Sequence, residues 1–476
     1  MKGNILYIFL ILLGGCAPSV PHMKKKEVDV ELPKEFPNTK GEQEKEPTSL
    51  KKWQQYFKDP ILLNLIDEAL QKNQELNILD EEIKIASNEV MSREGEYIPN
   101  LNFKSGYESE KVGEFTSQGI SDKSHTYEEG KEVGEVLHNH KVGLYTSWEI
   151  DIWGKLRNAS KAAYYRFLGS QEAKKLATTN LISELAMSYY ELIALDQNLE
   201  IINENVEILM RAQKLVKAQQ SAARVTSLAV QRFNAEVLKN QAKLYDIKQQ
   251  RYIVENRINI LVGRFPQHIK RGAIKLEDLV PLEVFHGIPT SLLDNRPDVK
   301  QAALELKAAE LDVKATKARF YPALSFEAGA GYEAFNKDHL GDNPQSIFWN
   351  LGVNLTAPLL NRSAIKADYY SANNAQVQAI FNYEKILITA FTEVTNQVNT
   401  IDNLTKKLTA KKEQMEALKN SVEISAVLFK AARVDYVEAL LTRRESLEAQ
   451  VEYIESNLEQ LSSVVKLYKA LGGGWQ

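Results

Sequence analysis

The sequence lacks three short motifs that carry phosphate, zinc and serine chemistry. It contains no Gly-x-x-x-x-Gly-Lys-Ser/Thr loop, no His-Glu-x-x-His pair and no Gly-x-Ser-x-Gly turn. Spacing along the chain also places no pair of carboxylates for general acid–base catalysis. The residues therefore predict a protein that is not an enzyme and that uses no metal or other catalytic cofactor.

Two histidines have a spacing that could bind a metal ion. His138 and His140 lie two residues apart, so both side chains would fall on one face of a strand. Two imidazole nitrogens need further ligands, and the sequence places no third ligand beside them. A polar loop is therefore the favoured interpretation, and the 6 scattered methionines offer no path for a soft metal.

The single cysteine, Cys16, has the most specific chemistry in the chain. It follows Lys2, an apolar stretch at 5–13 and two glycines. This arrangement resembles a bacterial lipoprotein signal, which implies cleavage of a signal peptide at 1–15 and acylation of the Cys16 thiol and amino group. Ala17, in the place where Asp would retain such a protein elsewhere, implies the outer membrane. The alternative is an ordinary signal peptide with an incidental cysteine.

Composition favours long elements and excludes some partners. The chain has 476 residues but only 23 Gly and 14 Pro, so long uninterrupted elements are expected. Its 59 basic and 63 acidic side chains give a net charge of −4, which provides no field for binding nucleic acid. No segment after the N-terminal apolar run could span a membrane as a helix, so entry into a bilayer would use strands.

The segment at 16–58 is predicted to be a lipid anchor followed by an extended tether. From Pro18 to Leu50 it is rich in Lys, Glu and Pro and has few large apolar residues. We expect no secondary structure between Pro18 and Leu50.

The rest of the chain has the pattern of a duplicated unit. The stretch Tyr97–Phe103 resembles Phe320–Phe326, and Arg224–Leu228 resembles Arg433–Val437. The two copies of the unit lie on either side of a short linker. The predicted segments are a first repeat at 59–263, a linker at 264–295 and a second repeat at 296–476.

Each repeat contains two stretches in which apolar and polar side chains alternate with the period of a strand. The predicted strands lie at about 98–110, 140–152, 322–335 and 346–358. The apolar face consists of Leu101, Phe103, Tyr107, Leu144, Thr146, Trp148, Ile150, Leu324, Phe326, Ala328, Ala330, Tyr332, Trp349, Leu351, Val353 and Leu355. Such alternation is typical of transmembrane barrel strands, and the alternative is a pair of soluble hairpins with one buried face. Four strands cannot enclose an aqueous lumen, so a pore would need several chains.

Between the strands the apolar residues recur in alternating steps of three and four, which is the heptad pattern of coiled coils. One seam runs from Leu181 to Leu209 and returns from Val230 to Leu261. The second runs from Leu387 to Val422 and returns from Leu440 to Val465. The outgoing helix of each repeat is predicted to run about 65 residues, or roughly 100 Å, and the paired helices to supercoil left-handedly.

Several ordered motifs closely resemble one known family. They are Leu293–Val299, Ala308–Leu311, Ala318–Pro322, Gly329–Tyr332 and the ending Leu467–Trp475. Together they resemble the TolC-like outer-membrane efflux lipoproteins, which serve resistance-nodulation-division (RND) pumps. The resemblance extends from about Trp53 to Trp475.

The resemblance implies an α+β membrane protein built as a TolC-like homotrimer. Three chains would each give four strands to a twelve-stranded outer-membrane β-barrel, and their long helices would form a periplasmic α-helical barrel with the linker at its equator. The implied partners are a periplasmic adaptor (the membrane fusion protein), an inner-membrane RND transporter and outer-membrane lipid. The chain would be anchored in the cell outer membrane by lipid on Cys16 and extend into the periplasm.

Three short segments have a structural interpretation. Arg296–Asp298 is predicted to open a helix, because Pro needs no backbone donor in the first turn and Asp298 suits the helix dipole. Gly95–Pro99 and Arg319–Pro322 are predicted to mark changes from helix to strand, where Pro stops a helix and aromatic side chains suit a membrane interface.

In the family each helical hairpin turns at a Gly, which takes a positive φ at little cost. The corresponding residues here are Arg224 and Arg433. Together with Val225 and Val434, they are the candidate tips for contact with the adaptor.

Asp435, Glu438 and Thr442 follow the second tip, near the acidic constriction that closes the pore in relatives. The family's gate acid corresponds to Thr442, so we expect this gate to be held differently. In a trimer each carboxylate would become a ring of three around the axis, which would attract cations. The alternative is that these acids are solvated groups at a helix start.

The function implied by the resemblance is passive conduction of drugs or other small solutes from pump and adaptor to the exterior. The exported solute is not identified, because in such systems the inner pump largely selects it. The alternative is a lipid-anchored coiled-coil tether or adhesin without a pore, which predicts soluble hairpins and no detergent-stable trimer.

Overall fold

The computed structural model describes residues 20, 21, 23, 26–33, 36, 52–124, 126–128, 131, 132, 134–272, 274–279, 295–360, 362–431 and 433–475. They divide into two compact units. The sheet unit comprises the described residues within 1–27, 85–167 and 304–380, and the helical unit comprises the described residues within 28–84, 168–303 and 381–476. The predicted signal peptide, Cys16 and the first two residues of the motif at 293–299 lie outside the described residues.

The elements follow the duplicated pattern of the sequence. The helices are α2 (Trp53–Tyr56), α3 (Pro60–Lys72), α4 (Gln74–Tyr97), α5 (Ser117–Ser124), α6 (Lys155–Ser221), α7 (Ser227–Val262), α9 (Pro297–Ala318), α10 (Ser363–Lys430) and α11 (Tyr436–Ala470), with short 3-10 helices η2 (Leu276–Leu279) and η3 (Lys337–His339). The strands are β1 (Asn100–Glu110), β2 (Thr126–Glu128), β3 (Lys131–Glu132), β4 (Leu137–Ile150), β5 (Ala323–Ala334) and β6 (Ile347–Thr356).

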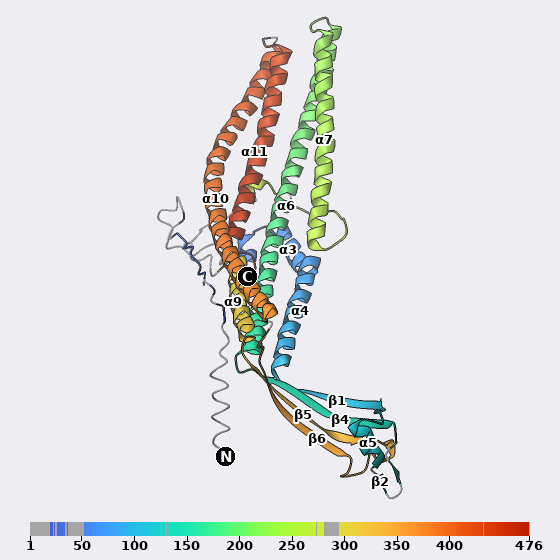
Figure 1. The fold of residues 1–476 in the computed structure, drawn as a ribbon. Helices are drawn as coiled ribbons and strands as arrows, with labels where there is room; N and C mark the ends of the chain where they lie inside the picture. Colours follow the sequence, from blue (N-terminus) through green and yellow to red (C-terminus); the bar gives the residue numbers. More distant parts are fainter. Residues whose placement is uncertain are drawn as a thin grey trace. The chain divides into compact units, whose positions relative to one another are not determined.

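The sheet unit contains a four-stranded sheet in the order β1-β4-β5-β6, with every neighbouring pair antiparallel (Figure 1). The prediction of four strands per chain is therefore confirmed. Strand β4 begins at Leu137, rather than near residue 140 as predicted, because it pairs with β1 as far as Glu110. Among the described residues, β1 and β6 are the two edges of this sheet.

The register places the predicted apolar side chains in continuous rows across all four strands. One row is Phe103, Leu144, Ala330 and Trp349, and the next is Leu101, Thr146, Ala328 and Leu351. Within the single chain this face is open, since Phe103 is 68% exposed and Trp349 is 77% exposed. Strand side chains alternate between faces, so the polar residues between these rows lie on the opposite face. The predicted division into an apolar and a polar face is confirmed.

Loops and helices leave the sheet at opposite ends. α5 and the β2–β3 hairpin connect β1 to β4, and Figure 1 shows α5 and β2 at the end of the sheet away from α4, α6, α9 and α10. The helix end is fixed by tryptophans. Trp148 Nε1 donates to the Tyr97 carbonyl at 2.9 Å, and Trp153 Nε1 donates to the Pro322 carbonyl at 2.8 Å. The predicted changes from helix to strand near Pro99 and Pro322 are confirmed, because α4 ends at Tyr97 and α9 ends at Ala318.

The helical unit is dominated by two hairpins, α6–α7 and α10–α11, whose helices lie side by side in pairs (Figure 1). α6 has 67 residues and α10 has 68, which confirms the long outgoing helix predicted for each repeat. The first predicted seam is largely buried. Its buried members on α6 are Leu181, Leu185, Ser188, Leu192, Leu195, Ile202, Val206 and Leu209.

Aromatic residues near the chain start are packed into the helical unit. The Tyr56 ring stacks on Tyr468 with centroids 4.0 Å apart, and Trp53 and Phe57 are buried beside them. The predicted tether at 16–58 therefore ends in the short helix α2, because these three aromatic side chains have a core to enter.

The described part of the tether upstream of α2 lies on α10. Residues 26–33 form neither helix nor strand, as predicted. The Asp29 backbone N–H donates to Glu384 Oε1 at 2.9 Å, and Phe36 stacks on Phe391 with centroids 5.2 Å apart. Phe36 is only 3% exposed, so an apolar side chain fastens the extended segment to the helix.

Arg296 has a structural role in the motif that begins α9. Its Nε and Nη2 donate to the two carboxylate oxygens of Asp298 at 3.0 and 2.6 Å, and Nη1 donates to Glu393 Oε2 and to the Ala470 carbonyl, both at 2.8 Å. The guanidinium thus joins the start of α9 to α10 and to the end of α11. The prediction that Arg296–Asp298 opens a helix is confirmed, with Pro297 as the first residue of α9.

None of the helices in the described part of the chain is both long and apolar enough to cross a membrane.

Candidate functional site

The polar face of the sheet is the first candidate site, and its middle is built on glycines. A Cβ at Gly329 would lie 2.8 Å from Tyr145 Cδ1, so the absence of a side chain lets the Tyr145 ring lie flat on the strand. Lys104 Nζ lies 5.1 Å from the centre of the Tyr145 ring, and Lys141 Nζ lies 4.5 Å from the centre of the Phe348 ring. This face therefore presents flat aromatic rings covered by lysine side chains.

The same face also carries carboxylates. Glu333 forms an ion pair with Lys141 at 3.1 Å, and Glu149 forms one with Lys155 at 2.6 Å. Glu327 and Glu108 lie on this face by register and strand alternation. Mixed charges and exposed amides make a wettable surface, which is what an aqueous passage needs on its inner side.

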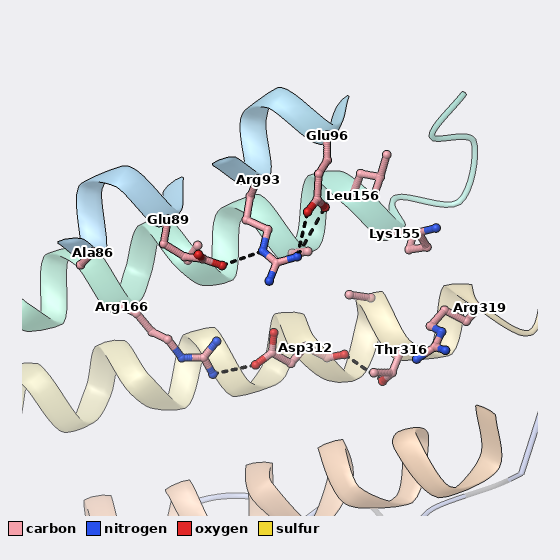
Figure 2. Close-up of a pocket in the computed structure, with 13 residues that line it drawn as sticks. Ala86, Glu89, Arg93, Glu96, Lys155, Leu156, Arg166, Asp312, Thr316 and Arg319 are labelled. Carbon is pink, nitrogen blue, oxygen red and sulfur yellow. Dashed lines mark hydrogen bonds and ion pairs between the residues drawn. The ribbon is translucent and has the colours of Figure 1, made fainter. Parts of the chain in front are cut away.

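A groove lies where α4, α6 and α9 run together in the sheet unit (Figure 2). It encloses about 570 Å³, and small side chains leave this space open. The small side chains that line it are Ala86, Ala159, Ala163 and Ala315. Arg93 lies 2.9 Å from Glu89 on α4, and Arg166 of α6 lies 2.6 Å from Asp312 of α9. These guanidiniums already have carboxylate partners, and the Arg166–Asp312 ion pair joins α6 to α9. We therefore assign the groove no ligand.

Asp151 lies in the short connection between the end of β4 and the start of α6. Its carboxylate accepts the backbone N–H groups of Leu156 and Arg157 at 3.1 and 2.9 Å, and its side chain is 2% exposed. Burial by itself raises the pKa of this carboxyl, but the two N–H groups and the Arg157 guanidinium outweigh burial and hold the pKa below its usual value.

The structure gives the turn of the first helical tip. The left-handed residue is Ala223, with φ 57°, which directly precedes the candidate tip residue Arg224. The Arg224 N–H donates to the Gln219 carbonyl and the Ala223 N–H donates to the Gln220 carbonyl, both at 2.9 Å. These two bonds form a Schellman ending of α6, which requires the positive φ one residue before Arg224.

The second tip repeats part of this arrangement. The Arg433 N–H donates to the Leu428 carbonyl at 2.9 Å. This bond reaches back five residues, as the bond from Arg224 to Gln219 does at the first tip. Residue 432, which corresponds to Ala223, lies outside the described residues. Val225 is half-buried and packs against the cluster at the α6–α7 tip, which Phe429 and Tyr436 of the second hairpin also contact.

The three candidate gate residues lie on the first turns of α11. Asp435 is the N-cap, and its Oδ1 accepts the Tyr436 N–H at 2.6 Å. Thr442 Oγ1 donates to the Glu438 carbonyl at 2.9 Å. Spacings of three and four residues put Asp435, Glu438 and Thr442 on one side of the helix, with both carboxylates exposed. The local bond of Asp435 is that of a helix-start acid, as in the alternative interpretation.

Sequence reasoning missed Arg443. This side chain is half-buried on α11, and no carboxylate in the described part of the chain is paired with it. Burial, and after it the charge of Arg211 on α6, lowers the pKa of the Arg443 guanidinium. The heptad pattern could have indicated this residue. Leu440 and Leu447 are apolar seam positions, and the seam position between them falls at residue 443 or 444, where the chain has arginine.

The structure brings a tyrosine to the histidine pair. His138 and His140 both lie on the apolar-row face of β4, and the Tyr107 hydroxyl lies 2.6 Å from His138 Nδ1. Within the described residues, no three His, Cys, Asp or Glu side chains gather in a way that could hold a metal ion.

Comparison with known proteins assigns the fold and the family. The model of the outer membrane efflux protein family matches residues 65–264 and 288–473. The toluene efflux pump outer membrane protein TtgI of Pseudomonas putida is 28% identical over 100% of this chain and 99% of its own length. The pyoverdine export outer membrane protein OpmQ of Pseudomonas aeruginosa is 26% identical over 90% of this chain and 88% of its own length.

A solved structure supports the same fold. The open-state MtrE outer membrane channel of Neisseria gonorrhoeae superposes with a TM-score of 0.81 at 22% identity, covering 96% of this chain and 98% of that one. The fold is thus that of TolC-like outer-membrane channels. The chain belongs to the outer membrane efflux protein family.

Proposed function

We propose that three copies of this chain form a passive export duct in the outer membrane. Each copy contributes the four strands β1, β4, β5 and β6 to a twelve-stranded barrel, and the long helices continue the duct into the periplasm. Cys16 carries the lipid that anchors each chain. A periplasmic adaptor docks on the helical tips and connects the duct to an inner-membrane RND transporter, which supplies the energy and selects the solute.

One observation carries this proposal. The apolar rows cross all four strands and reach both edge strands, β1 and β6, without interruption. An exposed, apolar, open-edged sheet is unfavourable in water, because the edges leave backbone groups unpaired and the rows expose Trp349 and Leu101. Pairing β6 of one copy with β1 of the next would satisfy the backbone groups, and lipid would cover the rows.

We further propose that Asp435, Glu438 and Thr442 line the periplasmic constriction. Three copies would gather six carboxylates around the axis, and their repulsion would be relieved by hydration or bound cations. The tips at Arg224, Val225, Arg433 and Val434 lie just beyond these residues and are the proposed adaptor contacts. Movement of α11 at the tip would then widen the ring.

Single-channel recording of the purified lipoprotein in planar bilayers tests both proposals. The variant Asp435→Asn with Glu438→Gln removes the charges, while Asn still accepts the capping hydrogen bond of α11. We expect closed or small cation-preferring conductance in the wild type, and larger conductance with weaker cation preference in the variant. Glu455→Gln, an exposed acid farther along α11, is the matched control and should leave the trace unchanged.

The outcomes separate the two proposals. An unchanged trace in the double variant removes Asp435 and Glu438 from the constriction but leaves the duct in place. A monomer that stays in aqueous buffer, with no conductance in any variant, overturns the duct itself.

A further inference from the structure

The loop end of the β1–β4 pair holds three side chains that can bind a metal together. The register pairs Tyr107 with His140 and Ser109 with His138, so all four side chains share one face. The Tyr107 ring stacks on His138 at 5.9 Å between centroids and lies 5.0 Å from the His140 ring. Sequence spacing supplied only two ligands, and the cross-strand neighbour supplies the third.

We propose that His138, His140 and Tyr107 form a binding site for a divalent copper ion. Tyr107 Oη and His138 Nδ1 lie 2.6 Å apart. Two imidazole nitrogens and one phenolate oxygen form a nitrogen and oxygen donor set, which suits the square-planar or tetragonal geometry of divalent copper.

Binding replaces one proton. In the apo protein a single hydrogen bond joins the Tyr107 hydroxyl and the His138 ring nitrogen. The copper ion takes the place of that hydrogen, the phenolic proton leaves to solvent, and the phenolate oxygen and His138 nitrogen both become ligands. His140 adds a second nitrogen, and water completes the coordination.

The position of the site decides what copper could do there. His138 is exposed and His140 is half-buried, and by register both lie at the loop end of β4, beyond the two apolar rows that lipid would cover, so an ion can enter from the solvent at that end. The site lies at the end of the sheet from which the long helices do not leave (Figure 1). A bound ion would clamp β1 to β4 beside the α5 and β2–β3 loop, and would stiffen that end of the sheet.

Copper titration of the full-length lipoprotein in detergent tests the site. We expect one Cu²⁺ per chain by equilibrium dialysis, nitrogen splitting in its electron paramagnetic resonance spectrum and a phenolate-to-copper charge-transfer band. His138→Ala and His140→Ala should each weaken binding at least about ten-fold, in keeping with loss of a direct ligand. Tyr107→Phe should abolish the charge-transfer band while the nitrogen splitting remains.

His339→Ala is the matched control, since His339 lies in the other sheet loop and pairs with Asp342 at 2.8 Å. It should bind copper as the wild type does. Equal binding by the wild type and the His138→Ala, His140→Ala double variant would overturn the site, and so would an unchanged charge-transfer band in Tyr107→Phe. The readout needs no conductance, so failure of the copper site and failure of the proposed duct are separate results.

Discussion

Single residues in this chain fix the points at which one element becomes another. Asp151 accepts two N–H groups at the start of α6, Ala223 turns the chain at the first tip, and Arg296 joins the start of α9 to the end of α11. Each satisfies backbone groups that a helix end leaves free. These positions are therefore where a small change in one side chain should be measurable.

Asp151→Asn should make the start of α6 less stable at neutral pH by about 0.5–2 kcal/mol, the usual effect of weakening a helix N-terminal acceptor. The pKa of Asp151 is lowered in the folded protein, so its carboxylate stabilises the fold above the ordinary carboxyl pKa of about 4 and loses this effect as pH falls through the folded pKa. The difference between wild type and variant should thus shrink below about pH 4. Thermal unfolding of both proteins between pH 3 and 7 checks this, and a pH-independent difference would contradict it.

Ala223→Gly should stabilise the first tip. A side chain in the left-handed region costs roughly 1–2 kcal/mol, and Gly avoids most of this cost. We expect slower amide hydrogen exchange around Gln219 and Arg224, whose bonds close the turn. Ala222→Gly is the control, because Ala222 has no positive φ and Gly there can only add flexibility. Slower exchange in both variants, or in neither, would argue against strain at Ala223.

At the scale of elements, sequence periodicity predicted the faces of individual strands and helices but not the contacts between neighbouring elements. Alternation in the strands and heptads in the helices are properties of one segment, so the apolar face and the seam from Leu181 to Leu209 could be read directly. The Tyr107–His138 contact could not, because it depends on which strand lies beside β4 and in which register. The left-handed residue at Ala223 could not be read from the sequence for a similar reason, since it depends on which backbone groups close the turn.

The seam of the second hairpin illustrates the same limit. Arg443 occupies a seam position between Leu440 and Leu447, and the heptad pattern treats such a residue as an interruption. Only the packing of α11 near α6 reveals that its neighbour is Arg211, whose charge opposes it. The sequence contained the unusual residue, but its partner belongs to another helix.

The β4–β5 pairing should be the part of the sheet most sensitive to added volume. At Gly331 a Cβ would press against the Val142 carbonyl and lie 2.9 Å from its carbon, so Gly331→Ala must push the two strands apart. We expect a loss of about 1–3 kcal/mol, as for other overpacked sites, and a lower temperature for loss of the folded band in electrophoresis. Gly352→Ala is matched, because its nearest neighbouring atom lies 3.9 Å away. It should behave as the wild type, and equal effects of both substitutions would exclude a steric cause.

At the scale of the whole molecule, duplication explains why the chain is incomplete by itself. Each repeat supplies two strands and one long helical hairpin. Two repeats make a sheet that still has an edge at β1 and another at β6 among the described residues. A further copy of the same chain offers complementary edges. Strand pairing between chains would then repeat the strand pairing that joins the two repeats within one chain.

Removing the lipid anchor separates a duct from a tether. The variant Cys16→Ser, placed behind an ordinary cleavable secretion signal, would carry no acyl chain. Moving an exposed Phe, Leu or Trp from water to hydrocarbon contributes roughly 1.5–3 kcal/mol, and each chain presents several such side chains on the apolar rows. Three chains together would then hold far more firmly than acyl chains, one of which gives only marginal binding. We therefore expect the variant to stay in the membrane through an alkaline carbonate wash and to be extracted by detergent as a trimer. Release into the wash as a folded monomer would instead identify a tether whose only hold on the membrane is the lipid on Cys16.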